Sequence, residues 1–409
     1  MTKNQSGFRS LHSTVTALLH LTNNWYLNID KGMTNLIVLL DLAKAFDTVS
    51  HNILLKKLEL YGLKGVTLDW FSSYLSDRQQ QCVVEGCVSK PQLISCGVPQ
   101  GSILGPLLFL IYINDLPGCL LHTKAHMYAD DTTIYASSVS TAELYAKVNN
   151  DLTRVRDWLL ANKLSLNVTK TEYMFLTTTF KLSNLGRDFP IKIGNNHVKR
   201  VQTTKYLGIH LDENLKWNEH VDKLCSKVNR SISGLKQARD YVPLDVLNTI
   251  YKSLIQPVFE YCDVVWDNLD QGFTTRIQKL QNRAARIITF QGYDVRSAQI
   301  RKQLNWEELE LASRRQRHLS LLMYDTVNGN IPSYLSDLFS NVCENNPYKS
   351  MLRNAEYNVV PDHVPKTEYY KGSFSYRGGM LWNSLPNDIK ASESKAIFKR
   401  KLASRQANC

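Results

Sequence analysis

Two adjacent aspartates between short apolar runs constrain the fold of this chain more than any other feature. Tyr128-Ala129-Asp130-Asp131 is a turn-like sequence, with His126 to Tyr128 leading in and Thr132 to Ala136 leading out. Aspartate is a favoured turn residue, so the pair alone is more often structural than functional. In a hairpin, one such carboxylate can point at a shared site while its neighbour points away. The pattern predicts a β-hairpin with acidic groups at its tip.

A third aspartate ends another apolar run. Leu36 to Leu40 is continuously apolar and of strand length, which is typical of a strand buried on both faces, and Asp41 follows it. In an α+β sheet, neighbouring strand ends can bring Asp41 to Asp130 and Asp131. Carboxylate oxygens are ligands that Mg²⁺ prefers. Two metal ions about 4 Å apart would activate an attacking hydroxyl and stabilise a leaving pyrophosphate, which is the chemistry of nucleotidyl transfer.

The remaining patterns predict a mixed first half and a helical second half. Helices are expected from Ser13 or Thr14, after Ser50, after Ser102 and over 141–163, and strands over 79–88, 173–177 and 191–198. After about residue 217, apolar stripes at helical spacing replace the strand patterns.

The charge balance favours a polyanionic partner such as nucleic acid. Lys and Arg number 49 against 37 Asp and Glu, which gives a net charge of +12. Lys223, Lys227 and Arg230 share a face of one expected helix, and a second helix carries Arg276, Lys279, Arg283 and Arg286 along one side. Each face alone is equally consistent with a solvated surface, but two such helices favour contact with phosphates.

Other features restrict the compartment and leave the tail open. The eight cysteines lack zinc-ligand spacing and indicate thiols in a reducing compartment. The first residues are polar, and the longest apolar run, Ile103 to Ile113, is too short to span a bilayer. We therefore expect an intracellular protein without a membrane partner, in nucleus or cytoplasm. The aromatic and basic tail, about 340–409, suits either base stacking or a small core with a basic surface.

With these residues in place, the sequence resembles the reverse transcriptases of non-LTR (LINE-type) retrotransposons, most of all the jockey-type lineages. The matching blocks follow the family's order and spacing over nearly the whole chain. They are Gln5-Ser6-Gly7-Phe8-Arg9 with His12-Ser13-Thr14, Leu40 to Asp47, Gly97 to Pro106, Tyr128 to Asp131, Leu166 to Glu172, Lys205 to Gly208, and Ser375 to Gly379 with Leu381 to Pro386.

The resemblance implies an α+β, right-hand polymerase fold. Partial fingers and a palm with a small antiparallel sheet would occupy residues 1–212, a helical thumb 213–300, and a mainly α, basic and aromatic extension 301–409. The implied activity is RNA-directed DNA polymerase, a two-metal nucleotidyl transfer from a dNTP to a DNA primer 3′-hydroxyl on an RNA template. The oligomeric state is not indicated.

The resemblance also implies a role for each matching site residue. Asp41, Asp130 and Asp131, with the backbone carbonyl of Leu42, would bind two Mg²⁺ ions, for which Mn²⁺ can substitute, and Lys170 would be the general acid. The implied nucleotide-binding residues are Arg9, Phe46, Gln100, Gly101 and Ser102, with Phe46 excluding a 2′-hydroxyl. The implied primer and template contacts are Tyr206, Leu207, Gly208, Lys223, Lys227 and Arg230.

The chain also departs from the family pattern. A fingers block before Gln5, an upstream endonuclease and a cysteine-rich knuckle are expected in the family and are not in this sequence. This predicts an N-terminally truncated fragment. A second hypothesis is therefore an inactive relic that only binds RNA or RNA–DNA duplex, and a third is a remnant without a cellular role.

Overall fold

The computed structural model describes residues 1–185, 190–306, 310–341 and 357–407. The chain forms two compact units, and each unit combines segments that are distant in sequence. The first unit is Met1–Ser13 with Met33–Gln202, and the second is Thr14–Gly32 with Thr203–Cys409.

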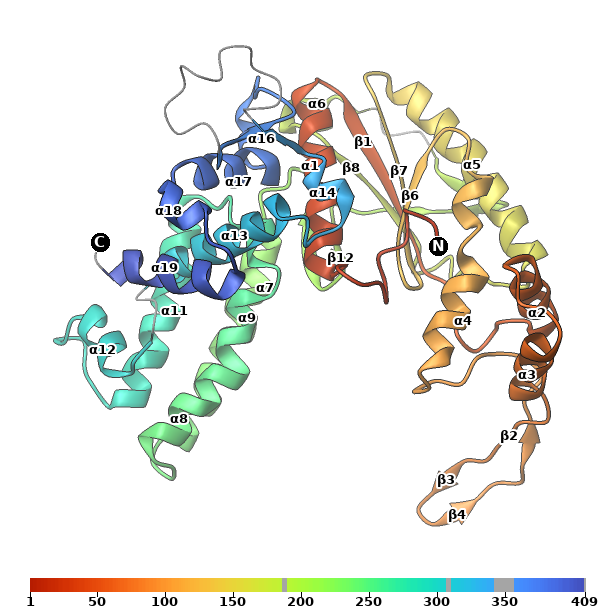
Figure 1. The fold of residues 1–409 in the computed structure, drawn as a ribbon, viewed down its shortest axis with the longest axis horizontal. Coiled ribbons are helices and arrows are strands. Elements are labelled where there is room, and N and C mark those ends of the chain that lie inside the picture. Colours follow the sequence, from red (N-terminus) through yellow and green to blue (C-terminus); the bar gives the residue numbers. More distant parts are fainter. Residues whose placement is uncertain (186–189, 307–309, 342–356, 408–409) are drawn as a thin grey trace. The chain divides into compact units, whose positions relative to one another are not determined.

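A five-stranded sheet lies at the centre of the first unit (Figure 1). Its order is β11-β8-β1-β7-β6, and every pair is antiparallel except β11 with β8. The strands are β1 (Thr34–Leu40), β6 (Lys124–Tyr128), β7 (Asp131–Ser138), β8 (Glu172–Leu176) and β11 (Lys199–Arg200). Leu36, Ile37 and Val38 are fully buried because β1 is paired on both edges and covered on both faces. The small sheet and the α+β class are confirmed.

Helices cover one face of this sheet and build the core of the unit. Leu36, Val38 and Leu40 alternate along β1 and pack in one cluster with the apolar side chains of α4 (Leu104–Ile113) and α5 (Thr141–Ala161). The stripe of α5 is buried as its spacing predicts, and the Ser140 hydroxyl accepts the Glu143 N–H at its start. The unit also contains η1 (Leu116–Cys119) and α6 (Thr179–Ser183).

A helical pair and a slender hairpin extend this unit beyond α4. α2 (His51–Leu60) packs on α3 (Val66–Leu75) and on α4, and the hairpin follows α3 (Figure 1). β2 (Gln79–Gln80) pairs with β5 (Gln92–Leu93), and β3 (Val83–Val84) pairs with β4 (Cys87–Val88).

The predictions of a single strand over 79–88 and over 191–198 are wrong, because a turn divides each segment. The expected strand over 79–88 reverses at Glu85 and Gly86, which both have positive φ, 49° and 80°. The expected strand over 191–198 reverses at Gly194, with φ 60°, between β9 (Lys192–Ile193) and β10 (Asn196–His197).

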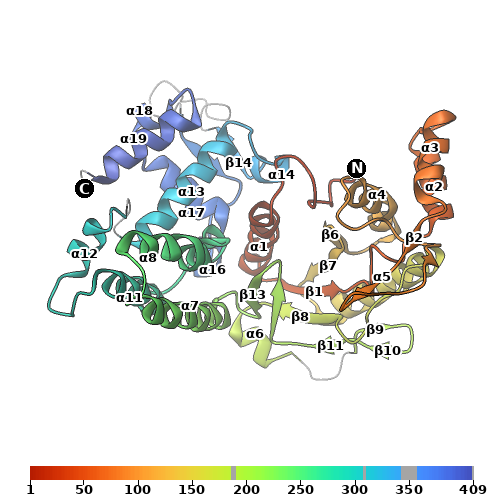
Figure 2. The ribbon, with the colours of Figure 1, turned by 90° about the horizontal axis from the view of Figure 1, so that it is seen from below.

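The second unit is mainly helical, and α1 (Thr14–Asp30) packs within it against C-terminal elements (Figure 2). The buried Asp30 carboxylate accepts hydrogen bonds from Thr367 N–H (2.6 Å), Lys366 N–H (3.0 Å) and the His363 ring (2.7 Å). The other elements of this unit are β12 (Thr203–Tyr206), β13 (Ile209–Asp212), α7 (Asn218–Ala238), α8 (Leu244–Ile250), the π-helix η2 (Tyr251–Ile255), α9 (Gln256–Glu260), α10 (Asp263–Trp266), α11 (Gln271–Thr289), α12 (Ser297–Gln303), α13 (Leu311–Val327), α14 (Ser333–Ser336), β14 (Phe339–Asn341), β15 (Val359–Pro361), α16 (Glu368–Lys371), α17 (Phe374–Asn383), α18 (Asn387–Lys390) and α19 (Lys395–Ala407).

The aromatic tail forms a core. Tyr370, Phe374 and Trp382 are each about 1% exposed, so these rings are not available to stack on bases. For these three rings, the alternative that the tail forms a small core is therefore correct. Part of the tail, 342–356, lies outside the described residues. No helix in the described ranges is long and apolar enough to cross a membrane.

Candidate active site

The acidic pair lies at the tip of a tight β-hairpin, as its sequence predicts. Tyr128 pairs with Asp131 across the end of β6 and β7, which leaves Ala129 and Asp130 as a two-residue turn. Ala129 takes the left-handed backbone conformation, with φ 55°, that such a turn requires at its first position. Asp130 is half-buried, while Asp131 starts β7 and is exposed as a whole residue.

The third aspartate lies beside this tip. Leu40 pairs with Thr132, and continuing the antiparallel register by one residue sets Asp41 opposite Asp131. Partial burial of its carboxyl, followed by the negative charges of Asp130 and Asp41, raises the pKa of Asp131. The strand order therefore brings the three carboxylates into one electrostatic environment.

This set of carboxylates fits a divalent cation in its chemistry. Three mutually repelling carboxylates at adjacent strand ends are stabilised by a hard cation, which prefers oxygen ligands. Within the described ranges, however, no group of three or more His, Cys, Asp or Glu side chains is gathered closely enough to hold a metal ion. The three carboxylates are thus neighbours in register and in electrostatic environment.

A buried glutamine clamps the acidic turn. Gln5 Oε1 accepts hydrogen bonds from the backbone N–H groups of Gly7 (2.7 Å) and Ala129 (3.0 Å), and Gln5 Nε2 donates to the Ala129 carbonyl (3.3 Å). Gln5 is fully buried, and Ser6 N–H donates to the Met127 carbonyl at 2.8 Å. The N-terminal segment therefore adds a short parallel pairing to β6 and fixes the backbone next to Asp130.

Close packing in this clamp requires a glycine. A Cβ atom at Gly7 would lie 2.3 Å from the Ala129 nitrogen, well inside contact distance. Arg9 completes the turn of the N-terminal segment, because its Nη1 donates to the carbonyls of Gln5 (2.8 Å) and Thr2 (3.0 Å). Arg9 is half-buried, and among the described residues only its Nη1 makes hydrogen bonds.

The loop that carries Lys170 is joined to Asp41 through the backbone. Asn167 N–H donates to the Asp41 carbonyl (2.8 Å), and Asp41 N–H donates to the Thr171 hydroxyl (3.4 Å). Leu42 forms a bridge with Leu166 and is 8% exposed. Lys170 is exposed within this loop, so the two blocks that contain Asp41 and Lys170 lie together.

Phe46 lies after the Asp41 strand and is half-buried. Its ring stacks on Phe109 of α4, with centroids 4.4 Å apart and planes at 28°. The Phe46 carbonyl accepts the Val98 N–H (2.8 Å), which joins this segment to the loop that leads to Gln100. Phe46 is therefore both a packing residue and a neighbour of that loop.

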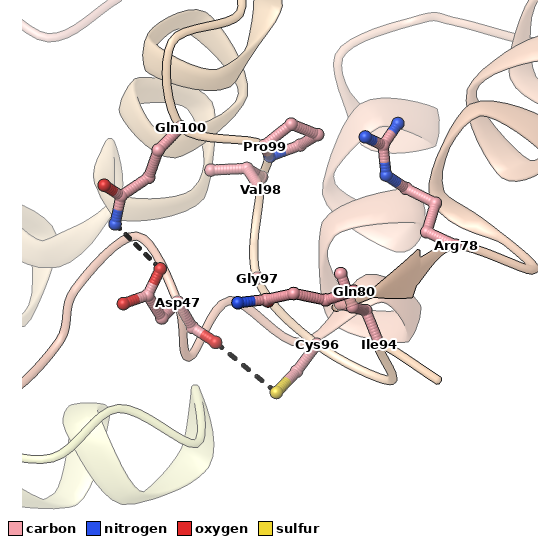
Figure 3. A pocket seen from close by; sticks show the side chains of 9 residues that line it. All are labelled: Asp47, Arg78, Gln80, Ile94, Cys96, Gly97, Val98, Pro99 and Gln100. Atoms are coloured by element: carbon pink, nitrogen blue, oxygen red, sulfur yellow. Dashed lines mark hydrogen bonds between the residues drawn. The ribbon is translucent and has the colours of Figure 1, made fainter. Parts of the chain in front are cut away.

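Gln100 lines a cavity of about 440 Å³, and Gly101 and Ser102 follow it directly in the same loop (Figure 3). Gln100 Nε2 donates to Asp47 Oδ1 (2.8 Å), which braces the loop. The Ser102 hydroxyl donates to the Pro99 carbonyl (2.7 Å) and accepts the Gly105 N–H (2.9 Å) at the start of α4. Gly101 has φ 78° and open space around its Cβ position.

The expected primer-contacting turn lies in the second unit. Leu207 and Gly208 both have positive φ, 43° and 85°, and join β12 to β13 directly after Tyr206. Tyr261 closes over this turn, because its hydroxyl donates to the Leu207 carbonyl (2.8 Å). A Cβ at Gly208 would lie 2.8 Å from that ring.

Two helices of the second unit carry cations side by side. α7 packs on α11, and Lys223, Lys227 and Arg230 are exposed on α7. Cations of α11 already have hydrogen-bond or ion-pair partners, which their spacing in the sequence does not predict. Arg276 pairs with Asp222 (2.5 Å), and Arg286 donates to the Ser297 hydroxyl (2.8 Å).

Sequence reasoning missed the clamp. Gln5 was expected only as part of a family block, and its contact with Ala129 joins residues 124 positions apart. A glutamine followed two positions later by a glycine, in a polar segment, was the available signal, and it is too common to indicate a turn-binding residue by itself.

Comparison with known proteins decides the family. A family model described as "Reverse transcriptase (RNA-dependent DNA polymerase)" matches residues 1–211, which is more than half of the chain. The chain belongs to the reverse transcriptase family. The strand–hairpin arrangement of its three aspartates lies within the matched residues.

The relatives come from non-LTR retrotransposons, as expected. The chain is 30% identical over 344 residues to the "Probable RNA-directed DNA polymerase from transposon BS" of Drosophila melanogaster, covering 78% of this chain and 37% of that protein. It is 28% identical to the "RNA-directed DNA polymerase from mobile element jockey" of Drosophila funebris, covering 70% and 32% respectively. The chain thus spans about a third of the length of these relatives.

Among solved structures, one similar chain is in "Structure of telomerase from Candida albicans in complexe with TWJ fragment of telomeric RNA". The match has a TM-score of 0.38 and 12% identity, and covers 76% of this chain and 52% of that one.

Proposed function

We propose that this chain carries the polymerase centre of a non-LTR retrotransposon. It transfers a nucleotide from a dNTP to the 3′-hydroxyl of a DNA primer paired with an RNA template. The observation that supports this most strongly is the meeting of Asp41 with Asp130 and Asp131 at adjacent strand ends, in a member of the reverse transcriptase family.

The three aspartates hold the divalent ions that the family generally uses. Bound Mg²⁺ ions would activate the primer hydroxyl and stabilise the pyrophosphate. Asp41, Asp130 and Asp131 supply the carboxylate oxygens, and Leu42 its backbone carbonyl. The buried Gln5 clamp on Ala129 restrains the turn that carries Asp130.

Residues around the loop at Gln100 bind the incoming nucleotide. Phe46, held against Phe109, lies under the sugar and excludes a 2′-hydroxyl. Gln100 and Ser102 present polar groups, and Gly101 allows the nucleotide to approach the backbone. The Arg9 guanidinium donates charge-assisted hydrogen bonds to the triphosphate.

Lys170 donates a proton to the leaving pyrophosphate, as its place in the loop bound to Asp41 allows. The rigid turn at Tyr206, Leu207 and Gly208 positions the primer end. Lys223, Lys227 and Arg230 contact duplex phosphates. Functionally, 1–212 would be fingers and palm, 213–300 the thumb, and 301–409 an extension.

Primer extension tests this proposal. The purified chain receives an RNA template with an annealed DNA primer, dNTPs and Mg²⁺ or Mn²⁺, and extension is compared between wild type, Asp130→Asn and the exposed control Asp157→Asn on α5. We expect extension by wild type and Asp157→Asn, none by Asp130→Asn, and none after removal of divalent ions with EDTA.

Extension that survives Asp130→Asn would contradict the catalytic assignment. Template binding that falls with salt and persists in Asp130→Asn, without extension by wild type, would instead favour the inactive nucleic-acid-binding relic.

A further inference from the structure

A row of aromatic and cationic side chains begins on α3 in the first unit and ends at Arg78, just beyond the last residue of that helix. Trp70 and Tyr74 are one helical turn apart, and their rings stack with centroids 5.5 Å apart and planes at 11°. The Arg78 guanidinium lies over the Tyr74 ring, 5.6 Å from its centroid. Trp70 is 52% exposed, so a large flat ring faces solvent, whereas Tyr74 beneath it is half-buried and packs against the core of the unit. We refer to Trp70, Tyr74 and Arg78 as the α3 row.

The charge at the end of the row is available to a ligand. Within the described parts of the chain, the Arg78 guanidinium contacts the Tyr74 ring and forms no ion pair or hydrogen bond. Asp69 precedes Trp70 by one position and therefore lies on a different side of the helix. An exposed guanidinium stacked on an aromatic ring is a group that pairs with phosphates.

The row leads into the cavity beside Gln100. Figure 3 shows Arg78 on one side of this cavity and Asp47 with Gln100 on the other. Among the described residues that line it, Asp47 is the only acidic one, and its carboxylate accepts a hydrogen bond from Gln100. The cavity therefore presents amide groups of Gln80 and Gln100 together with one cation, a lining that suits base edges and a phosphate rather than an apolar molecule.

We propose that the α3 row and this cavity bind a single-stranded stretch of the RNA template. The inference rests on the proposed polymerase function, because it assigns the template to a surface in the same unit as the catalytic aspartates. Bases of a single strand stack on exposed rings, whereas those of a duplex are already stacked on one another. Arg78 pairs with the backbone, and Gln80 contacts the bases that enter the cavity on the side away from Gln100.

The test is equilibrium binding of a fluorescein-labelled, unstructured 15-nucleotide RNA, measured by anisotropy without dNTP or divalent ions. The variants are Trp70→Ala, Trp70→Phe and Arg78→Ala. The controls are Phe180→Ala, which removes another exposed ring of the first unit, and Lys192→Ala, which removes another exposed cation. Circular dichroism confirms that each variant is folded, and Trp70→Phe keeps a stacking ring should Trp70→Ala unfold.

We expect Trp70→Ala to weaken single-strand binding by about tenfold or more, and Trp70→Phe to retain most of it. Arg78→Ala should also weaken binding, and the slope of log affinity against log salt concentration should fall by nearly one, as expected for the loss of one phosphate contact. Affinity for a blunt RNA duplex of the same sequence should not change in Trp70→Ala. Equal affinities of wild type, Trp70→Ala and Arg78→Ala for the single strand would overturn the inference. The inference would also be overturned if the control variants lost as much affinity, or if affinity for the duplex fell equally. The row would then suit a protein partner instead.

The outcomes separate the two proposals. If RNA binding depends on Trp70 but the chain never extends a primer, the α3 row is supported as an RNA-binding surface and the polymerase function is refuted. Extension that depends on Asp130, together with RNA binding that Trp70→Ala does not weaken, supports the polymerase function and refutes the role of the α3 row.

Discussion

At the scale of single residues, the acidic turn is positioned by a side chain 124 positions earlier in the chain. Gln5 binds both the N–H and the carbonyl of Ala129, so the backbone between Tyr128 and Asp130 has little freedom to rotate. Ala129 sits at positive φ, a conformation that costs free energy for a residue with a Cβ unless its surroundings hold it. The clamp supplies that restraint, which makes Gln5 a positioning residue for Asp130.

We expect Gln5→Met to release the turn while preserving side-chain volume. The variant leaves the buried Ala129 N–H without an acceptor, at a cost of about 1–3 kcal/mol. Amide hydrogen exchange in a peptide covering residues 127–131 should become faster, and the turnover rate of extension should fall about tenfold with little change in the dNTP KM.

Gln237→Met, at an exposed position near the end of α7, is the control and should match wild type in both measurements. Unchanged exchange in the hairpin of Gln5→Met would show that the clamp does not restrain the turn.

Gly7→Ala tests the close approach of the two segments. The added methyl group would lie 2.3 Å from the Ala129 nitrogen, so the N-terminal segment must move away from the hairpin. We expect lower thermal stability and reduced extension. Gly118→Ala is the matched control, because nothing lies within 4 Å of its Cβ position, and it should be neutral. Equal behaviour of the two variants would contradict the described packing.

At the scale of elements, the sequence predicted those whose signals are local. The apolar run before Asp41 is a central strand, the Asp130–Asp131 turn is a hairpin tip, and the stripe of α5 is buried. Prediction was less successful where a turn with left-handed residues interrupts a strand pattern, as at Glu85 and Gly86. Long-range contacts were not predictable, since neither the Gln5 clamp nor the packing of α1 on C-terminal helices leaves a periodic signal.

The packing of α7 on its neighbours predicts an acid-sensitive second unit. His220 on α7 is buried against Trp266, and burial followed by the nearby His210 lowers its pKa to about 4. Burial also lowers the pKa of His210. The unfolded chain binds protons below pH 6.5 that folded His220 cannot, so stability is complete above pH 6.5 and is lost as the pH falls toward 4.

We expect His220 to account for a loss of roughly 3 kcal/mol in the free energy of unfolding between these limits. Urea unfolding at a series of pH values, followed by circular dichroism, measures it. His220→Leu should flatten this dependence, whereas His197→Gln, at an exposed position on β10, should not. A wild-type stability that is constant from pH 6.5 to 4 would contradict the assignment.

At the scale of the whole molecule, the three candidate carboxylates and the basic helices belong to different compact units. The first unit carries Asp41, Asp130, Asp131 and the α3 row, and the second carries the turn at Gly208 and the cations of α7. The net charge of +12 is consistent with the polyanionic substrates that we propose for this chain. Sequence motifs predicted this set of candidate residues, but only the structure joins the loop of Lys170 to Asp41, through hydrogen bonds that Asn167 and Thr171 make with the Asp41 backbone.

The central claim, that this chain transfers nucleotides at its three aspartates, is tested most directly by incorporation of a single nucleotide. A DNA primer on an RNA template is mixed with the one complementary dNTP and Mg²⁺, and the rate is measured with enzyme in excess. We predict incorporation by wild type and Asp157→Asn, and a loss of about a thousandfold or more in Asp41→Asn and Asp130→Asn. Equal rates for wild type and Asp130→Asn, or no incorporation by a folded wild-type chain that binds the primer–template, would contradict the account.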